Sequence, residues 1–161
     1  MSPDIDERLA SVVRALSEVI LPHLPPDASL AQEQVHLCIG HLQIIRAQID
    51  EAPAFERGEL EDALTLAEAL SAGISGGEQT RKALAALAVA RSEAATLGEG
   101  PSAVRAGRQN VLQAIDALVK AAACDADAPS RAYLSAEILR HESERTLKDR
   151  QWFAPFGFDT L

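Results

Sequence analysis

The fold of this chain is constrained most strongly by apolar residues that recur every three or four positions, in segments bounded by proline or glycine. The first such stripe ends at Pro22 and comprises Ile5, Leu9, Val12, Val13, Leu16, Val19 and Ile20. Positions three and four apart share one face of a helix, so the segment predicts an amphipathic helix. Ser2 followed by Pro3 is typical of an N-cap and first helical position.

Five further segments carry the same rhythm. They predict helices over about residues 29–51, 53–72, 75–97 and 102–124, and a last one that follows the loop 125–130 and ends near Arg150. Aromatic residues make up only 4% of the chain, which favours helices over strands. Short connections predict antiparallel neighbours, and 161 residues suit one domain. We therefore expect an all-α, up-and-down bundle of about six helices over residues 1–150.

The balance of charge excludes some partners. Fifteen Lys and Arg residues against 24 Asp and Glu give a net charge of −9, which repels phosphate backbones and anionic lipid. We expect no nucleic acid and no membrane partner. The chain starts without a basic, apolar leader, which indicates a cytoplasmic protein. Cys38 and Cys124 lack CxxC spacing, so both are expected to be reduced, and no cofactor is indicated.

The segment from Ile74 to Leu87, beginning Ile74-Ser75-Gly76-Gly77-Glu78-Gln79, resembles the signature motif of the ATP-binding-cassette and chromosome-maintenance ATPases. In those families the motif presents a helix N-terminus to a nucleotide phosphate. The chain contains no GxxxxGK[ST] loop, so the signature has nothing to complete. A capping box with Ser75 as N-cap explains the same residues, and we expect it to be structural.

Two pairs have metal-like spacing. Glu33 and His36 match half of a di-metal carboxylate pattern but project from the polar side of their helix, so we expect them to be exposed and metal-free. Glu137 and His141 could bind a metal only with ligands from another helix. We predict no metal site.

Arginines interrupt two apolar faces. In the helix expected over residues 75–97, Arg91 lies at the centre of an inward face made of Leu84, Leu87, Ala88, Ala94 and Ala95. In the helix expected over residues 102–124, Arg108 lies at the centre of an inward face made of Val104, Val111, Leu112, Ile115 and Val119. An antiparallel hairpin places both arginines at one level. Buried unpaired charges cost several kcal/mol, so an anionic group must come from another helix, a second protomer or a ligand.

Other polar residues also interrupt apolar arcs: Gln34, His41 and Gln48 at seven-residue spacing, and His141 with Arg145. Together with Arg91 and Arg108 they could line the bundle interior and hold a small carboxylate or phosphate. The alternative is that Glu137, Glu142 or another acid pairs each arginine, or that the long arginine side chains extend to the surface.

The C-terminal residues 151–161 are rich in aromatic side chains: Trp152, Phe153, Phe156 and Phe158. Pro155 and Gly157 oppose a helix, so we expect an ordered, non-helical tail. Because exposed aromatic rings are costly, the tail should dock on its own bundle or on a partner protomer.

The first fifty residues, especially Leu16 and the run from Val19 to Pro25, resemble an uncharacterised family of small helical bacterial domains. Members accompany aminoglycoside-phosphotransferase-like kinases and acyl-CoA dehydrogenases, which implies an accessory role. The sequence thus favours a non-enzymatic interaction module, with a homo-oligomer or a protein partner. The alternative is a protein or enzyme that binds a small acidic ligand near Arg91 and Arg108.

Overall fold

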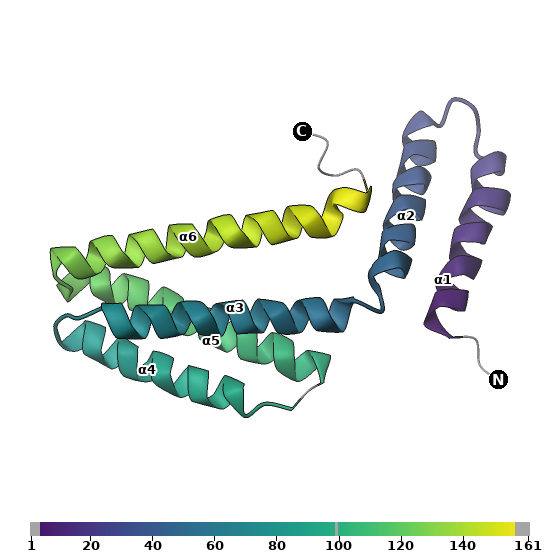
Figure 1. Ribbon diagram of the computed structural model, residues 1–161. Helices are drawn as coiled ribbons and strands as arrows, with labels where there is room; N and C mark the ends of the chain where they lie inside the picture. The colour runs from purple at the N-terminus through teal and green to yellow at the C-terminus, as the bar shows by residue number, and fades with distance from the viewer. Residues whose placement is uncertain (1–3, 99, 157–161) are drawn as a thin grey trace. The chain divides into compact units, whose positions relative to one another are not determined.

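The structure is a computed structural model that describes residues 4–98 and 100–156, and within them it is all-α, as predicted. The elements are α1 (Ile5–Arg14), the π-helical η1 (Ala15–Ile20), the 3-10 turn η2 (Leu21–His23), α2 (Ser29–Gln48), α3 (Ala52–Gly73), α4 (Glu78–Ala95), α5 (Pro101–Asp125), α6 (Ala128–Phe153) and the 3-10 turn η3 (Ala154–Phe156) (Figure 1). The last predicted helix therefore extends further than expected, since α6 includes residues beyond Arg150.

Contacts within the chain group into two compact units, Met1–Ala52 and Pro53–Leu161. We call them the N-terminal unit and the C-terminal unit. The sequence had indicated one bundle domain over residues 1–150, and its periodicity did not mark this boundary, which falls in the first turn of α3.

The N-terminal unit is a hairpin of two helical arms. Asp4 caps α1, since its Oδ1 accepts the Glu7 N–H at 2.7 Å; the predicted cap, Ser2, lies outside the described residues. The chain also stays helical through Pro22 as η2, because proline at the start of a 3-10 turn loses no internal hydrogen bond. Arg46 of α2 donates from Nε and Nη2 to the two carboxylate oxygens of Asp6, at 2.7 and 3.0 Å, which ties the arms together.

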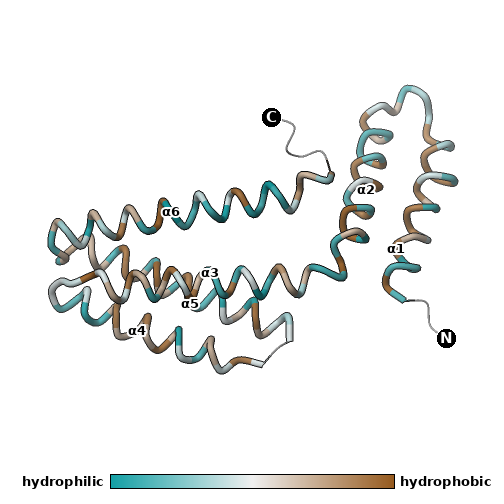
Figure 2. The backbone as a smooth tube through the Cα atoms, in the orientation of Figure 1, coloured by the Kyte–Doolittle hydropathy of each residue, from teal (hydrophilic) through white to brown (hydrophobic). Residues whose placement is uncertain are grey.

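In the C-terminal unit, α3 to α6 run alternately in opposite directions (Figure 1). Hydrophobic positions recur along α3, α4 and α5, whereas α6 becomes mostly hydrophilic toward its C-terminal end (Figure 2). The buried apolar side chains follow this pattern: Leu60, Ala63, Leu66, Ala67, Leu70, Ile74, Ala83, Leu87, Ala94, Val104, Val111, Ile115, Leu118, Ala122, Ala126 and Leu134. The apolar core therefore extends along α3, α4 and α5 and reaches α6 in its N-terminal half, at Leu134.

Helices α4 and α5 pack closely because small residues face each other. A Cβ added at Gly107 of α5 would lie 2.4 Å from Leu97 Cδ1 and 3.6 Å from Ala94 Cβ. The inward face differs in part from the prediction: Ala88, Ala95 and Leu112 are exposed. The face of α4 that is buried instead follows Ala83, Leu87 and Ala94, about one position away from the predicted arc.

The start of α4 is capped by a carboxylate from another helix. Asp125, the last residue of α5, accepts the Gln79 N–H at 2.7 Å, the Thr80 N–H at 3.1 Å and the Thr80 hydroxyl at 2.5 Å. The hydrogen bond from the Thr80 hydroxyl is the largest cause of a lowered pKa of Asp125, and the hydrogen bonds from the two backbone N–H groups lower it further. A Cβ at Gly77 would lie 2.5 Å from Asp125 Oδ2, so glycine is what lets the carboxylate approach.

The predicted capping box was therefore wrong in detail. Gly77 is the N-cap of α4, without a side-chain hydrogen bond, and the Ser75 hydroxyl instead donates to Asp127 at 3.2 Å. Asp127 in turn caps α6 by accepting the Ser130 N–H at 2.7 Å. The helix terminus that would hold a phosphate in the ATPase signature is filled here by the protein's own Asp125, which agrees with a structural role for the motif.

Candidate functional site

The two core-facing arginines pair with glutamates of α3. Arg108 Nη2 lies 2.7 Å from Glu59 Oε2, and Glu59 is only 7% exposed. Arg91 Nη2 lies 3.5 Å from Glu68 Oε2, whose side chain is 74% exposed. Of the three sources that the sequence left open, another helix, a second protomer or a ligand, the structure shows the first, since both glutamates lie on α3. One arginine thus holds a buried carboxylate and the other a solvated one.

Neither of the acids suggested from the sequence serves these arginines. Glu137 binds Arg140, at 2.8 Å, and Glu142 binds Arg145, at 3.2 Å. Both pairs lie within α6 and are partly exposed, so they contribute little to stability.

A cavity of about 210 Å³ lies between α3, α5 and α6. It brings together three of the predicted residues, Arg108, His141 and Arg145, and is completed by Glu59, Asp62, Ala63, Leu112 and Glu142. Arg91 is not among these lining residues. We call this cavity the charged groove.

His141 is the unusual member of the charged groove. The residue is 9% exposed, and neither ring nitrogen has a hydrogen-bond partner within the described part of the chain. Its Nδ1 lies 3.9 Å from Glu142 Oε1, which is too long for a hydrogen bond. Leaving a buried polar group unpaired costs about 1–3 kcal/mol. The imidazole of His141 therefore has hydrogen-bonding capacity that the other residues of the groove do not use.

The charges of the groove do not favour an anion. Its lining holds three acids, Glu59, Asp62 and Glu142, against two arginines. Each acid already has a basic partner, since Asp62 binds Lys148 of α6. A carboxylate or phosphate would have to displace one of these acids, and the predicted cationic lining is therefore not what the structure presents.

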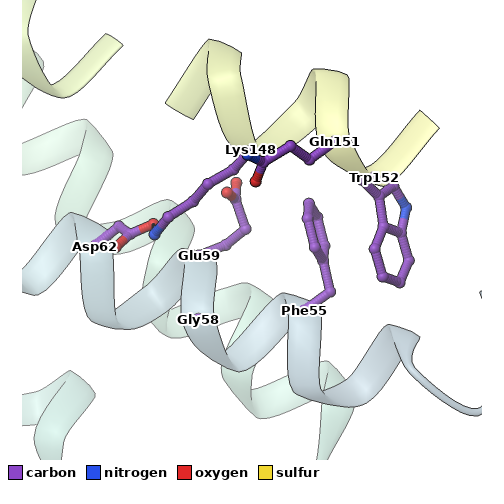
Figure 3. Close-up of a pocket in the computed structure, with 7 residues that line it drawn as sticks. All are labelled: Phe55, Gly58, Glu59, Asp62, Lys148, Gln151 and Trp152. Carbon is purple, nitrogen blue, oxygen red and sulfur yellow. Dashed lines mark hydrogen bonds and ion pairs between the residues drawn. The ribbon is translucent and has the colours of Figure 1, made fainter. Parts of the chain in front are cut away.

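A second cavity of about 330 Å³ adjoins the first and shares Glu59 and Asp62 with it (Figure 3). Phe55 of α3 and Trp152 of α6 stack at one end, with ring centroids 4.4 Å apart and planes inclined by 25°. Trp152 is thus part of a helix and packs on its own chain.

The other tail aromatics are distributed differently. Phe153 ends α6 with 40% exposure, and Phe156 is half-buried in η3. The prediction of a non-helical tail from residue 151 was therefore wrong for Trp152 and Phe153, while Phe158 lies outside the described residues.

Sequence reasoning missed Glu59 and Asp62, which line the charged groove from α3, and Phe55, which lines the second cavity. Glu59 had a detectable signal, because it precedes Leu60 and lies four residues before Ala63 on the buried stripe of α3. An acid on an apolar stripe indicates a buried ion pair as plainly as the arginines do.

The remaining predicted residues lie on α2, in the N-terminal unit. Gln34 and His41 are exposed, and Gln48 is half-buried. Glu33 and His36 are exposed, as predicted, and His36 Nδ1 lies 2.9 Å from the Gln32 carbonyl oxygen. Nowhere in residues 4–98 and 100–156 do three His, Cys, Asp or Glu side chains converge as a metal site.

No protein-family model, curated protein or solved structure matches the chain. Among the helices that the structure describes, none combines the length and apolar character needed to cross a bilayer.

Proposed function

We propose that this protein is a non-enzymatic interaction module, in which the N-terminal unit associates with a protein surface. The observation that carries the proposal is that none of residues 4–52 is buried. Large apolar side chains of this unit are exposed on both helical arms: Ile5, Val12, Val19, Ile20, Leu30, Leu37 and Ile45.

The energetics of a two-helix hairpin support this proposal. Burying a Val, Leu or Ile side chain contributes about 1.5–3 kcal/mol, and such burial must offset an ordering cost of about 1–2 kcal/mol for each backbone residue. One shared seam buries only one face of each arm. The unit therefore gains a substantial part of its stability only when a second surface covers the exposed side chains.

The C-terminal unit suits a supporting role. We propose that α3 to α6 form an up-and-down four-helix bundle, with Asp125 and Asp127 capping α4 and α6 at one end and the charged groove at the other. Each acid of the groove is held by a cation, which favours structural ion pairing over acid–base catalysis.

Hydrogen exchange of the intact chain, read by mass spectrometry, tests the proposal. In a sample diluted until the mass is that of one chain, amides of α1 and α2 should exchange much faster than those of α4 and α5. The α4–α5 hairpin is the internal control. If α1 and α2 are as protected as α4 and α5 in the isolated chain, the N-terminal unit needs no partner and the proposal fails.

A second candidate function, a site for a small polar ligand in the charged groove, is favoured by one observation: the unpartnered imidazole of His141. His141→Leu separates the two cases. Without an occupant, removing both unpaired nitrogens should leave stability unchanged or higher. A small mass retained by the native protein in gentle mass spectrometry, and lost together with stability in His141→Leu, would establish the ligand site.

A further inference from the structure

The two ends of α6 differ in how they meet the rest of the C-terminal unit. The buried residues of this helix are Ser130, Leu134 and His141, and the last of them lies near its midpoint. None of residues 142–153, all of which the structure describes, is buried. We call residues 142–153 the latch. It is the part of α6 that the apolar core does not hold.

The inward side of the latch lines cavities. Glu142 and Arg145 line the charged groove, and Lys148, Gln151 and Trp152 line the second cavity. These residues recur every three or four positions, so they share one side of the helix. A helical segment of about 12 residues is marginal on its own in water. The latch therefore depends on the side chains that join it to α3.

Lys148 and Trp152 join the latch to α3 (Figure 3). Lys148 pairs with Asp62, and the Trp152 ring stacks on Phe55 with centroids 4.4 Å apart. The side chains of Lys148 and Asp62 are 49% and 30% exposed. Water and salt screen an ion pair with this exposure. The attachment of the latch to α3 should therefore weaken as the ionic strength rises.

His141, directly before the latch, favours an open position. Both ring nitrogens are buried and have no hydrogen-bond partner in the part of the chain that the structure describes. Because the nitrogens are covered, a molecule in the charged groove reaches them only if the latch moves. Opening lets water or a ligand bond to the imidazole and so removes the cost of burying these nitrogens unpaired.

We propose that the latch opens from α3 about His141 while the rest of the C-terminal unit stays folded, and that this movement controls access to the charged groove. The buried apolar core is supplied by residues that precede the latch, so it is retained in the open state. Opening exposes the His141 ring and the carboxylate of Glu59, which is 7% exposed in the closed state. The movement is independent of the association proposed for the N-terminal unit.

Hydrogen exchange of the full chain, read by mass spectrometry on peptides of α6, tests the proposal. Residues 130–141 are the matched control within the same helix. At about 0.02 M sodium chloride, latch amides should exchange at least about tenfold faster than the control. At about 1 M, where the screening length falls to about 3 Å, latch exchange should rise by a further factor of about two to five. Exchange of the control should not change.

Lys148→Gln separates the ion pair from a general effect of salt. It removes the cation that holds Asp62, so the latch should exchange at low salt about as fast as the wild type does at high salt. Lys120→Gln is the control, because Lys120 pairs with Asp116 within α5 and its loss changes the net charge equally. It should leave latch exchange within about twofold of the wild type.

Labelling of histidines with diethyl pyrocarbonate, which modifies accessible ring nitrogens, measures access to the groove. His141 should react faster at high salt and in Lys148→Gln, by the same factor as latch exchange. His41, which is exposed on α2, is the control and should react at a constant rate. Latch opening without faster labelling of His141 would overturn the control of access.

Three exchange results would overturn the latch itself. The first is protection of the latch equal to that of residues 130–141 at every salt concentration. The second is fast exchange that neither salt nor Lys148→Gln changes, since that is fraying of a helix end. The third is equal acceleration of both parts of α6, which shows unfolding of the whole helix.

Discussion

Replacing Arg108 with Met should strand a buried carboxylate. Glu59 is 7% exposed and holds Arg108 at 2.7 Å, so the variant leaves its charge without the cation. Removing one partner of a fully buried pair costs about 3–5 kcal/mol. Because the Arg108 side chain is 32% exposed, water screens part of the interaction, and we expect a loss of about 2–3 kcal/mol.

Arg91→Met is the matched control, because both arginines were predicted to lie at one level of the α4–α5 hairpin. Its partner Glu68 is largely exposed and 3.5 Å away, so the loss should be below about 1 kcal/mol. The double variant Glu59→Met with Arg108→Met should return to within about 1 kcal/mol of the wild type.

Urea unfolding at neutral pH, followed by circular dichroism, measures these differences in the free energy of unfolding. Equal losses for Arg91→Met and Arg108→Met would show that the burial of Glu59 does not govern the energetics of the groove. A double variant as unstable as Arg108→Met alone would refute the reasoning as well.

Three further predictions concern the C-terminal unit. Gly77→Ala should destabilise the fold by about 1–3 kcal/mol because its Cβ meets the Asp125 carboxylate. A Cβ at Gly58 meets nothing within 4 Å, so Gly58→Ala should stabilise α3 by about 0.5–1 kcal/mol. Thermal unfolding of both variants tests the sign of each change. Hydrogen bonds lower the pKa of both capping aspartates, Asp125 and Asp127, below the ordinary 3.8. The two carboxylates therefore stabilise the fold above about pH 4, and this stabilisation is lost as the pH falls through their pKa values in the folded protein. Unfolding free energies measured against pH should show that slope, and Asp125→Asn should reduce it. Phe55→Ala should cost about 1–2 kcal/mol and shift the fluorescence of Trp152, the single tryptophan, to longer wavelength; an unchanged spectrum would contradict the stacking.

The helices were predictable because their signals are local. The apolar rhythm of Ile5 to Ile20 and the breaks at Pro25, Gly73 and Pro101 depend on neighbouring residues, and the helices appear at nearly the expected positions. The cap of α4 was not predictable in this way. Asp125 is 46 residues from Gln79, and its approach depends on how two loops meet, so the nearer Ser75 appeared to be the better candidate.

The candidate site was half predictable for the same reason. Arg108, His141 and Arg145 stood out as polar residues on apolar faces, and the structure places them in one cavity. The acids that α3 contributes to the groove, Glu59 and Asp62, depend on the angle at which that helix crosses the hairpin, which no local spacing encodes. The equal status of Arg91 and Arg108 in the sequence also concealed that only one of them meets a buried acid.

Sedimentation equilibrium of the intact chain over a wide range of concentration tests the central claim most directly. Where the surface that the N-terminal unit binds is a second copy of the chain, we predict a reversible change from the mass of one chain, 17.2 kDa, to that of two. Leu37→Glu on the exposed face of α2 should abolish the change, and Leu139→Glu on exposed α6 should leave it intact. A single-chain mass at every concentration, with α1 and α2 protected from hydrogen exchange, would contradict the account.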